Sequence, residues 1–518
     1  MPRLNHRRAA IEETVRRHRK GDIVTLIPRT KPGEYSVELP AEFSVAELAD
    51  YLSVYCANPL FRSARFEELE IDDDPYRRPV RPEDLSFLRY DRPFGRPDAS
   101  QLSALIGHRM LLNIHDTAKP MFAEKMTPER WEEYRLFYGE RNRVLGELVR
   151  PLLERHVFGF VHDTVAEQTA DAPEPGTASL RGLLADLADR RSHAAEEVLD
   201  LVAGAGAVAE AAKMTAVQLL AGTINAPLRI SPLMLTAATD GAGGAHAALT
   251  ATHREPHRVD AVLGAVLDAC GFGAQPHRYY QYYLPSTLAA MNYLNATARD
   301  HGRVFEFLGA MCVRTLDSLA LIGGHGARLA ELAASAASAG PADTAQTEAA
   351  LAPAAPEAET AAAIEEITRT VLEPLAHRFG APALAAFDRG AREYALLLDV
   401  HHDDLTVQLR FIDSSEAYRA KAERLQAAID EHRIPVALDT FVESWEECST
   451  THVHDDDRLL VIESGEMEFW NCFSGTHKFR PGDKIFIPKH RLHGSVVLSG
   501  ECVYHQPVID ADLDRRYG

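Results

Sequence analysis

Three histidines near the end of the chain have the residue type and the spacing of metal ligands. His452 and His454 lie two residues apart in THVHDDD, and His493 follows in RLHG. On a β-strand, residues two apart leave the same face, so the first two imidazoles would point together. Three imidazoles that converge inside a small barrel form a divalent metal site with open coordination positions. The alternative is a metal-free barrel that binds a sugar or another small molecule.

The residues around these histidines predict the short strands that would position them. Apolar and polar residues alternate in LLVIESGEMEFW, which is expected to turn at Ser464 and Gly465, and HKFRPGDKIFIPKH is expected to turn at Pro481 and Gly482. Several short strands separated by glycine turns are typical of a jelly-roll barrel. We assign this barrel to residues 420–518.

This pattern resembles the cupin family. The shared features are the H-x-H pair, Gly465, the PGD turn and the last histidine in RLHG. Cupins carry a glutamate four residues after the second histidine of the pair, and this chain has Arg458 there. The resemblance therefore implies a metal set of three histidines without a protein carboxylate, with Asp457 as an alternative ligand. Three histidines leave about three positions of an octahedral iron for a bidentate substrate and dioxygen.

Helical periodicity accounts for most of the remaining chain. Apolar residues recur every three or four positions, which predicts an N-terminal helical domain at residues 1–165 and a helical bundle at residues 175–415. An alanine- and proline-rich stretch at residues 327–363 is expected to be a mobile insertion, because it has too little apolar bulk to offset the entropy of ordering. The expected class is therefore multidomain α+β.

The composition of the 518 residues limits the partners that we expect. A formal net charge of -21 argues against nucleic acid and anionic membranes as partners. The six cysteines lack a CxxC spacing, which argues against a disulfide framework or a zinc knuckle and favours a reducing cytosol. The sequence has no apolar signal segment and no run of 18 apolar residues, so we expect a soluble cytoplasmic protein.

A longer series of motifs, in the same order, resembles the N-nitrosourea-forming metalloenzymes of streptozotocin biosynthesis. The motifs are NPLF, DDPYRRPVRPEDL, RVLGELVRPLLERHVFGFVHD, HRYYQYYLPSTL, the HHDD helix, and THVHDDD through RLHG to ECVY. This family implies an N-terminal helical dimerisation domain, a central haem-oxygenase-like bundle and a C-terminal monoiron cupin. In that family, the bundle is a diiron oxygenase that hydroxylates both guanidine nitrogens of Nω-methyl-L-arginine. The family's cupin then rearranges the product into an N-nitrosourea and makes the nitrogen–nitrogen bond.

The resemblance also implies that the cupin ligands are kept and that most diiron ligands are lost. The last bundle helix of the family has a His-x3-Asp-x2-His pattern, and this chain has Ala395, Asp399 and His402. Asp399 and His402 alone cannot hold two irons, so we expect Fe(II) in the cupin and no diiron centre in the bundle. Asp399 and His402 are then either residual metal ligands or, as we favour, a leftover polar pair. The alternative for the bundle is a diiron centre completed by unrecognised ligands. The other positions where family ligands are replaced are Ala226, Val259 and Thr315.

The function that this resemblance favours is a non-haem iron cupin oxygenase of specialised metabolism. It would form a nitrogen–nitrogen bond from dioxygen and an N-hydroxylated guanidine, such as an N-hydroxylated methylarginine, and would act as a homodimer. Arg458, Arg491 and Tyr504 lie beside the ligand motifs and are candidates to orient the arginine-derived substrate. Two alternatives are a full N-hydroxylase with a divergent diiron centre, and a noncatalytic scaffold that pairs with an active homologue.

Overall fold

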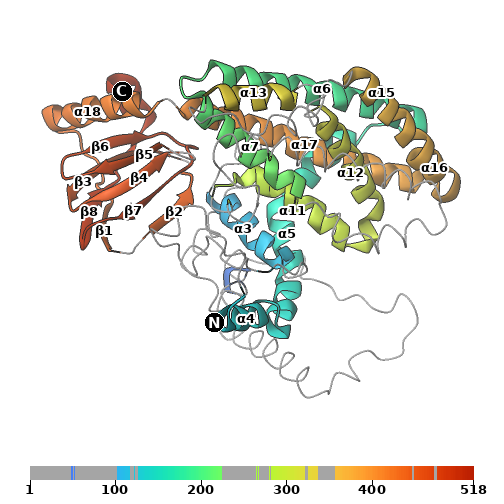
Figure 1. Cartoon of the computed structure of the whole chain (residues 1–518), viewed down its shortest axis with the longest axis horizontal. Helices are drawn as coiled ribbons and strands as arrows, with labels where there is room; N and C mark the ends of the chain where they lie inside the picture. Colours follow the sequence, from blue (N-terminus) through green and yellow to red (C-terminus); the bar gives the residue numbers. More distant parts are fainter. Residues whose placement is uncertain are drawn as a thin grey trace.

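The computed structural model consists of a large helical part followed by two β-sheets and a short C-terminal helix (Figure 1). No helix among the described residues is long and apolar enough to cross a membrane. The structure describes residues 48–50, 52, 102–116, 122, 126–224, 264, 267, 279, 282–320, 325–336, 356–412, 414–445, 448–454, 456–471 and 475–518.

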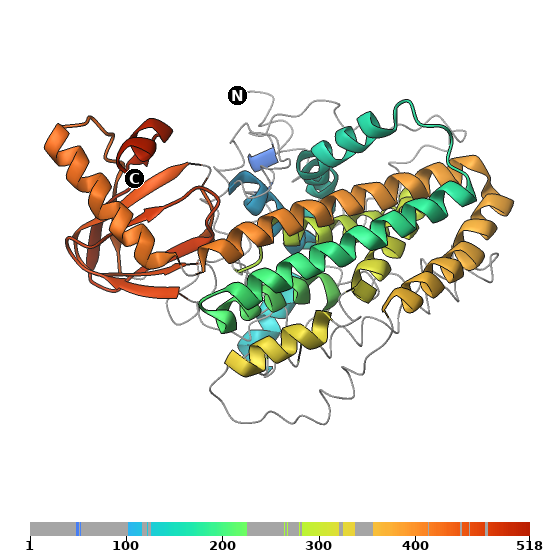
Figure 2. The same ribbon diagram turned by 90° about the horizontal axis from the view of Figure 1, so that it is seen from above.

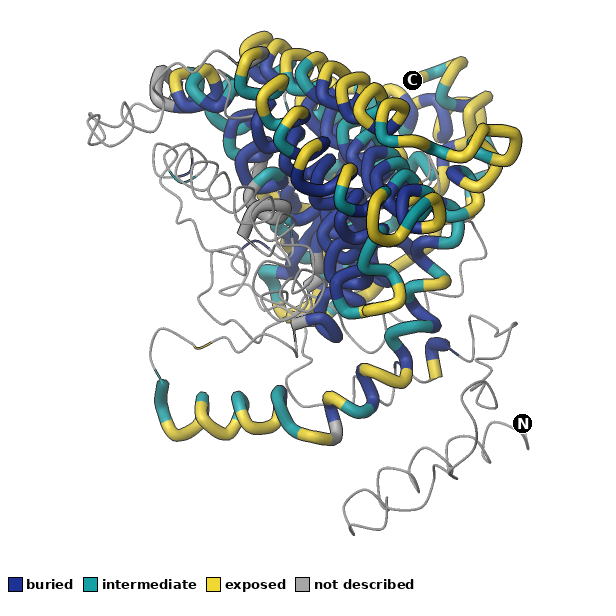
Figure 3. The backbone as a smooth tube through the Cα atoms, turned by 90° about the vertical axis from the view of Figure 1, so that its right-hand side faces the viewer, coloured by how far each residue is buried: buried dark blue, intermediate teal, exposed yellow. Residues whose placement is uncertain are grey.

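The helical part is built around α11 (Pro285–Arg299), α12 (Val304–Ala320) and α17 (Ala381–Phe411). Every residue of α11 from Pro285 to Ala298 is buried, so this helix forms the centre of the bundle. The long helix α17 runs along the bundle and ends beside the sheets (Figure 2). The buried backbone, in dark blue, is concentrated in this bundle (Figure 3). The other helices are α3 (Leu102–Asp116), α4 (Pro128–Phe137), α5 (Glu140–Thr169), α6 (Thr177–Gly204), α7 (Val208–Ile224), α13 (Gly326–Ala336), α15 (Pro356–Ile367) and α16 (Glu373–Phe379), with a 3-10 turn at His301–Arg303 and a π-helical turn at Thr368–Leu372.

Two glycines allow α12 and α17 to pack backbone against backbone. A Cβ atom on Gly390 of α17 would lie 2.0 Å from the carbonyl oxygen of Glu306 on α12. A Cβ atom on Gly309 of α12 would lie 2.2 Å from the carbonyl oxygen of Phe387 on α17. Because any side chain at either position would collide with main-chain atoms, the contact between the two central helices requires glycine at both.

The predicted insertion at residues 327–363 is wrong at both of its ends. Helix α13 covers Gly326–Ala336 and buries Leu329 and Ala333 in the bundle, and α15 begins at Pro356. Alanine is the strongest helix former, and its small side chain fits closely packed helices, so these stretches gain enough packing to become ordered. Residues 337–355 lie outside the described residues.

The N-terminal helices share their core with the central bundle. Met110 of α3 and Val157 of α5 belong to the same buried apolar cluster as Leu187 of α6, Phe307 of α12 and Phe387 of α17. The boundary that the sequence predicted between an N-terminal domain and the bundle, near residues 165–175, coincides with a turn between α5 and α6. The packing continues across this turn.

The C-terminal part contains two antiparallel sheets. The first sheet has the order β1-β8-β3-β6, with β9 also paired to β3, and the second has the order β2-β7-β4-β5. Gly465 and Gly482 have φ values of 84° and 92°, which confirms the two predicted glycine turns. The strands are β1 (Thr440–Ser444), β2 (Cys448–His452), β3 (Asp457–Ser464), β4 (Met467–Asn471), β5 (Gly475–Phe479), β6 (Lys484–Ile487), β7 (His493–Val497), β8 (Glu501–His505) and β9 (Val508–Ile509).

The two sheets pack face to face as a β-sandwich. Leu460 and Tyr504 of the first sheet share an apolar cluster with Phe469 and Val497 of the second sheet. The outer face of the first sheet is covered by α18 (Ser415–His432), whose Leu425 belongs to a separate cluster together with strand and α19 (Ala511–Tyr517) residues. In the described residues no strand pairing joins the two sheets into the closed barrel that the sequence predicted.

Candidate metal centre

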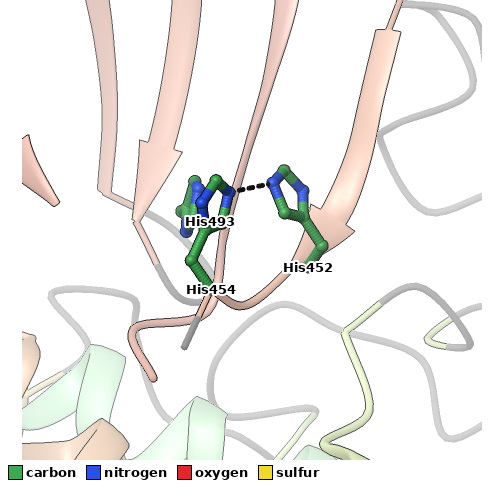
Figure 4. A group of neighbouring side chains, drawn as sticks. All are labelled: His452, His454 and His493. Carbon is green, nitrogen blue, oxygen red and sulfur yellow. Dashed lines mark hydrogen bonds between the residues drawn. The ribbon is translucent and has the colours of Figure 1, made fainter. Parts of the chain in front are cut away.

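The three predicted ligand histidines meet at one end of the sandwich (Figure 4). His452 is the last residue of β2, and it is paired across the sheet with His493, the first residue of β7. His454 follows two residues later and turns its ring toward the other two. The potential ligand atoms of the three side chains all lie within 4.8 Å of one another, and the Nε2 atoms of His452 and His454 are 2.7 Å apart. This is the single group of its kind within the part of the chain that the structure describes.

The chemistry of His493 fits a metal ligand. Its Nδ1 lies 2.7 Å from the backbone carbonyl oxygen of Arg491, which can only accept, so Nδ1 carries the proton. Nε2 then carries a lone pair. This atom is buried beside the other imidazoles and has no hydrogen-bond partner among the described residues. Burial, and after it the neighbouring His452 and His454, lowers the pKa of His493 well below its ordinary value. A neutral imidazole with its second nitrogen held by a carbonyl is the form in which histidine binds metals.

Sequence reasoning missed Asp456, a carboxylate that lies between His454 and Arg458. One oxygen of Asp456 is 3.8 Å from Nδ1 of His454 and accepts a hydrogen bond from Nε of Arg458 at 2.7 Å. Although burial raises the pKa of Asp456, its interactions with His454 and Arg458 hold the pKa below its ordinary value. A carboxylate behind a ligand histidine orients the ring and increases its basicity. Asp456 lies within ion-pair distance of His454, so we expect it to play this part here.

Removing this carboxylate is expected to lower the metal affinity of the site without abolishing metal binding. Asp456→Ala should lower the affinity for Fe(II) or Co(II) about 10- to 100-fold, the usual cost of losing an outer-shell partner of a ligand. The measurement is a metal titration against a competing chelator. Asp430→Ala, at an exposed carboxylate on α18, is the control and should bind as the unaltered protein does. Equal affinity in both variants would show that Asp456 does not support His454.

Asp457, which the sequence predicted as an alternative ligand, points away from the three histidines. It occupies the first position of β3 and shares a strand face with Leu459, which packs toward α18 on the outer side of the sandwich. Its carboxylate accepts a hydrogen bond from the backbone N–H of Lys489 at 2.8 Å. The expected metal set of histidines without Asp457 is therefore the one that the geometry assembles.

The three predicted substrate residues differ in their surroundings. Arg458 shares the inner face of β3 with Leu460 and pairs with Asp456, next to the histidines. Arg491 is fully buried, but its guanidinium donates to Ser415 at 3.1 Å and lies 5.0 Å from the ring centroid of Tyr418, both on α18.

Tyr504 points into the sandwich from β8. Its hydroxyl is hydrogen bonded to Glu443 and Ser449, and burial, followed by the charge of Glu443, raises the pKa of the phenol. Its ring stacks on Phe441 at a centroid distance of 5.2 Å. Substrate binding by these three residues stays a prediction, and Arg458 is the one whose side chain pairs with the carboxylate beside His454.

Asp399 and His402, the expected remnants of a diiron site, have other partners. The carboxylate of Asp399 pairs with Arg191 at 3.4 Å and with Arg190 at 3.6 Å, and His402 lies 3.0 Å from Glu197. Arg191 is buried and also donates to Asp317 of α12 at 2.8 Å.

Two of the four positions where the family ligands are expected to be replaced lie among the described residues. Ala395 is buried in the apolar core and Thr315 donates its hydroxyl to the carbonyl of Met311 within α12. Ala226 and Val259 lie outside the described residues. A buried guanidinium thus stands between Asp317 and Asp399 in the middle of the bundle.

Comparisons with known proteins place the chain next to one enzyme. No protein-family model matches the chain. It is 27% identical over 481 residues to the nitrosourea synthase of Streptomyces achromogenes subsp. streptozoticus, covering 90% of this chain and 96% of that enzyme. The chain is similar to that nitrosourea synthase over nearly the whole length of both proteins. The resemblance found in the sequence motifs is thereby confirmed. Because only a tenth of the chain is left out, the similarity includes both the helical part and the sandwich.

Proposed function

We propose that this protein is a non-haem iron enzyme that forms the nitrogen–nitrogen bond of an N-nitroso product in its cupin-type sandwich. The observation that carries the proposal is the convergent group of His452, His454 and His493, in a homologue of an enzyme that makes a nitrosourea. The substrate that we propose is an N-hydroxylated guanidine, such as an N-hydroxylated methylarginine, together with dioxygen.

The residues of the chain supply the binding site for the cofactor and its surroundings. His452, His454 and His493 would hold Fe(II), which supplies the one-electron and dioxygen chemistry that side chains lack. Three neutral imidazoles leave the charge of a divalent ion uncompensated, which favours a deprotonated N-hydroxyguanidine as the ligand that completes the site.

Aromatic and aliphatic side chains shield one side of the histidine group from water. The ring of Phe469 stacks on His493 at a centroid distance of 5.7 Å, and Phe469 belongs to the apolar core between the two sheets. On the polar side, Arg458 and Asp456 form an ion pair beside His454. This asymmetry gives a substrate with one charged end a preferred orientation.

We propose further that N-hydroxylation is done by another protein. The support is a group of ion pairs in the bundle. Arg191 is paired with the carboxylates of Asp317 and Asp399, which a metal ion would need as ligands. The alternative, a divergent diiron centre in the same chain, would have to use residues other than these. A homodimer formed through the N-terminal helices stays a prediction, and the molar mass in solution is the measurement that checks it.

The test is anaerobic reconstitution of the full chain with Fe(II), followed by iron analysis and oxygen-consumption assays. We expect about one iron per chain, and oxygen uptake with N-hydroxylated Nω-methylarginine but not with unmodified methylarginine. About three irons, with turnover of unmodified methylarginine, would instead favour the complete N-hydroxylase. Iron binding without oxygen uptake on any hydroxyguanidine would favour a noncatalytic scaffold partner.

A further inference from the structure

One face of the last turns of α17 carries three buried polar side chains that lead from the bundle toward the metal ligands. These are His401, Asp404 and Gln408, whose spacings of three and four residues place them on one side of the helix. Gln408 has no exposed surface. A buried carboxamide destabilises the fold unless it is hydrogen bonded, so its partners show what it does.

Both ends of the Gln408 carboxamide bind the segment that precedes His493. Its Nε2 donates to the backbone carbonyl of His490 at 2.5 Å, and its Oε1 accepts from the backbone N–H of Leu492 at 3.0 Å. A side-chain amide offers both a donor and an acceptor in a fixed plane, so it can hold two backbone groups at once. The bundle helix therefore fixes the main chain on both sides of Arg491, immediately before the ligand His493.

His490 connects the segments that carry two of the ligands. Its backbone N–H donates to the carbonyl oxygen of His454 at 2.7 Å, while its own carbonyl is held by Gln408. Its φ of 67° lies in the left-handed region, which residues other than glycine rarely adopt. Such a conformation persists only where the surrounding contacts enforce it. Gln408 supplies one of these contacts.

Apolar contacts reinforce the same junction. Val453 lies between two ligand histidines and Leu492 precedes the third, and both are fully buried. They belong to one apolar cluster with Leu405 and Leu409, two residues close to Gln408 on α17. The ligands thus point into the sandwich, while the residues next to them are embedded in the bundle.

The strand that carries His452 is held by a second bundle helix. The guanidinium of Arg109, on α3, donates from Nη2 to the backbone carbonyl of Thr451 at 2.7 Å. Arg109 is buried, and Thr451 directly precedes His452. All three ligand segments are therefore in contact with helices of the bundle, directly or through His490.

The orientation of Gln408 is itself fixed from inside the bundle. Asp404 is hydrogen bonded to Gln408, and it accepts a hydrogen bond from the hydroxyl of Ser286 on α11 at 2.7 Å. The same hydroxyl lies 3.4 Å from Nδ1 of His401. A chain of buried polar contacts consequently runs from the central helix α11 to the loop before His493.

We propose that Gln408 is a positioning residue of the metal centre, so that the helical bundle forms part of its outer shell. This inference rests on the metal binding that the proposed function assigns to the three histidines. Without the carboxamide, the 490–492 segment loses the partners that hold His490 in its left-handed conformation. His493 then loses its fixed direction toward His452 and His454.

The test measures metal affinity and coordination geometry in the full-length protein. Co(II) is titrated anaerobically into Gln408→Leu, Gln408→Glu and the unaltered protein, and the visible absorption bands report the geometry of the bound ion. Gln426→Leu is the matched control, because Gln426 is a helical glutamine that donates to Asp430 at an exposed site on α18. Circular dichroism and thermal unfolding of the metal-free proteins separate folding from metal binding.

We expect Gln408→Leu to bind Co(II) about 10- to 100-fold more weakly, with altered absorption bands, while Gln426→Leu behaves as the unaltered protein does. Gln408→Glu should be intermediate, because it keeps the acceptor for Leu492 and loses the donor to His490. A purely structural role would lower the unfolding midpoint but leave affinity and spectrum unchanged.

Folded Gln408 variants with unaltered affinity and spectrum would overturn the positioning role alone. An unaltered protein that binds no divalent metal would overturn the proposed function as well, so the two failures can be told apart. If Gln408→Leu does not fold, Gln408→Glu, which keeps one of the two hydrogen bonds, carries the same test.

Discussion

Replacing His493 with alanine is expected to abolish tight binding of Fe(II) or Co(II). This residue supplies a buried Nε2 lone pair whose tautomer is fixed by the carbonyl of Arg491, so no other nitrogen can take its place. Losing a partner of a ligand costs about 10- to 100-fold in affinity, and losing the ligand itself should cost more than about 100-fold. Oxygen uptake with a hydroxyguanidine substrate should be lost together with the metal.

The control for this experiment is His505→Ala. His505 lies on β8 with its ring near the hydroxyl of Thr440 and the carboxylate of Glu463, away from the histidine group. It should bind metal as the unaltered protein does. If His493→Ala kept the original affinity and the His505 variant lost it, the metal site would have to be placed elsewhere in the sandwich.

Replacing Gly390 with alanine adds a single methyl group to the bundle. We expect this substitution to destabilise the protein more than a methyl group added anywhere else in the bundle. The new Cβ would lie 2.0 Å from a main-chain oxygen of α12, and main chain cannot rotate away as a flexible side chain can. Overpacking a close contact costs about 1–3 kcal/mol, and this clash should reach the upper end because α12 and α17 must separate. Thermal unfolding of the metal-free protein measures the effect.

The same substitution at Gly159 serves as its control. Gly159 lies inside α5, and apart from its own helical turn no atom of the described residues comes within 4 Å of the place that a Cβ would occupy, so alanine meets no obstacle from them. Alanine is favoured over glycine inside a helix by about 1 kcal/mol, so Gly159→Ala should raise the unfolding midpoint. Equal destabilisation by both substitutions would mean that the close contact between α12 and α17 is not the cause.

The turns around the histidine group could be predicted because a local rule determines them: they need the positive φ that Gly465 and Gly482 supply. His452 and His454 do come together as expected, but β2 ends at His452, so the shared face of a strand is not what places His454 there. The same strand rule, with β3 beginning at Asp457, turns that carboxylate outward. Asp456 was missed because it lies in the bend before the strand, where no period applies.

The contacts between bundle and sandwich could not be predicted from local patterns. Gln408 and His490 are 82 residues apart, and Arg109 and Thr451 are 342 apart. A glutamine or an arginine inside a helical stretch is usually exposed, so nothing in the sequence distinguishes these two from solvated residues. The helical ends of the predicted insertion were missed for a related reason, since alanine-rich stretches become ordered only when a neighbouring helix covers them.

The guanidinium of Arg191 lies between Asp317 and Asp399 and supplies the positive charge that a bound metal ion would otherwise have to supply to these carboxylates. A bound ion stabilises a fold by mass action, so its contribution rises and falls with the concentration of the free ion. A cation that is covalently part of the chain is present in every copy at the same effective concentration. On the proposal that the bundle holds no iron, its folding would not depend on the iron supply, and only the occupancy of the histidine group would follow that supply.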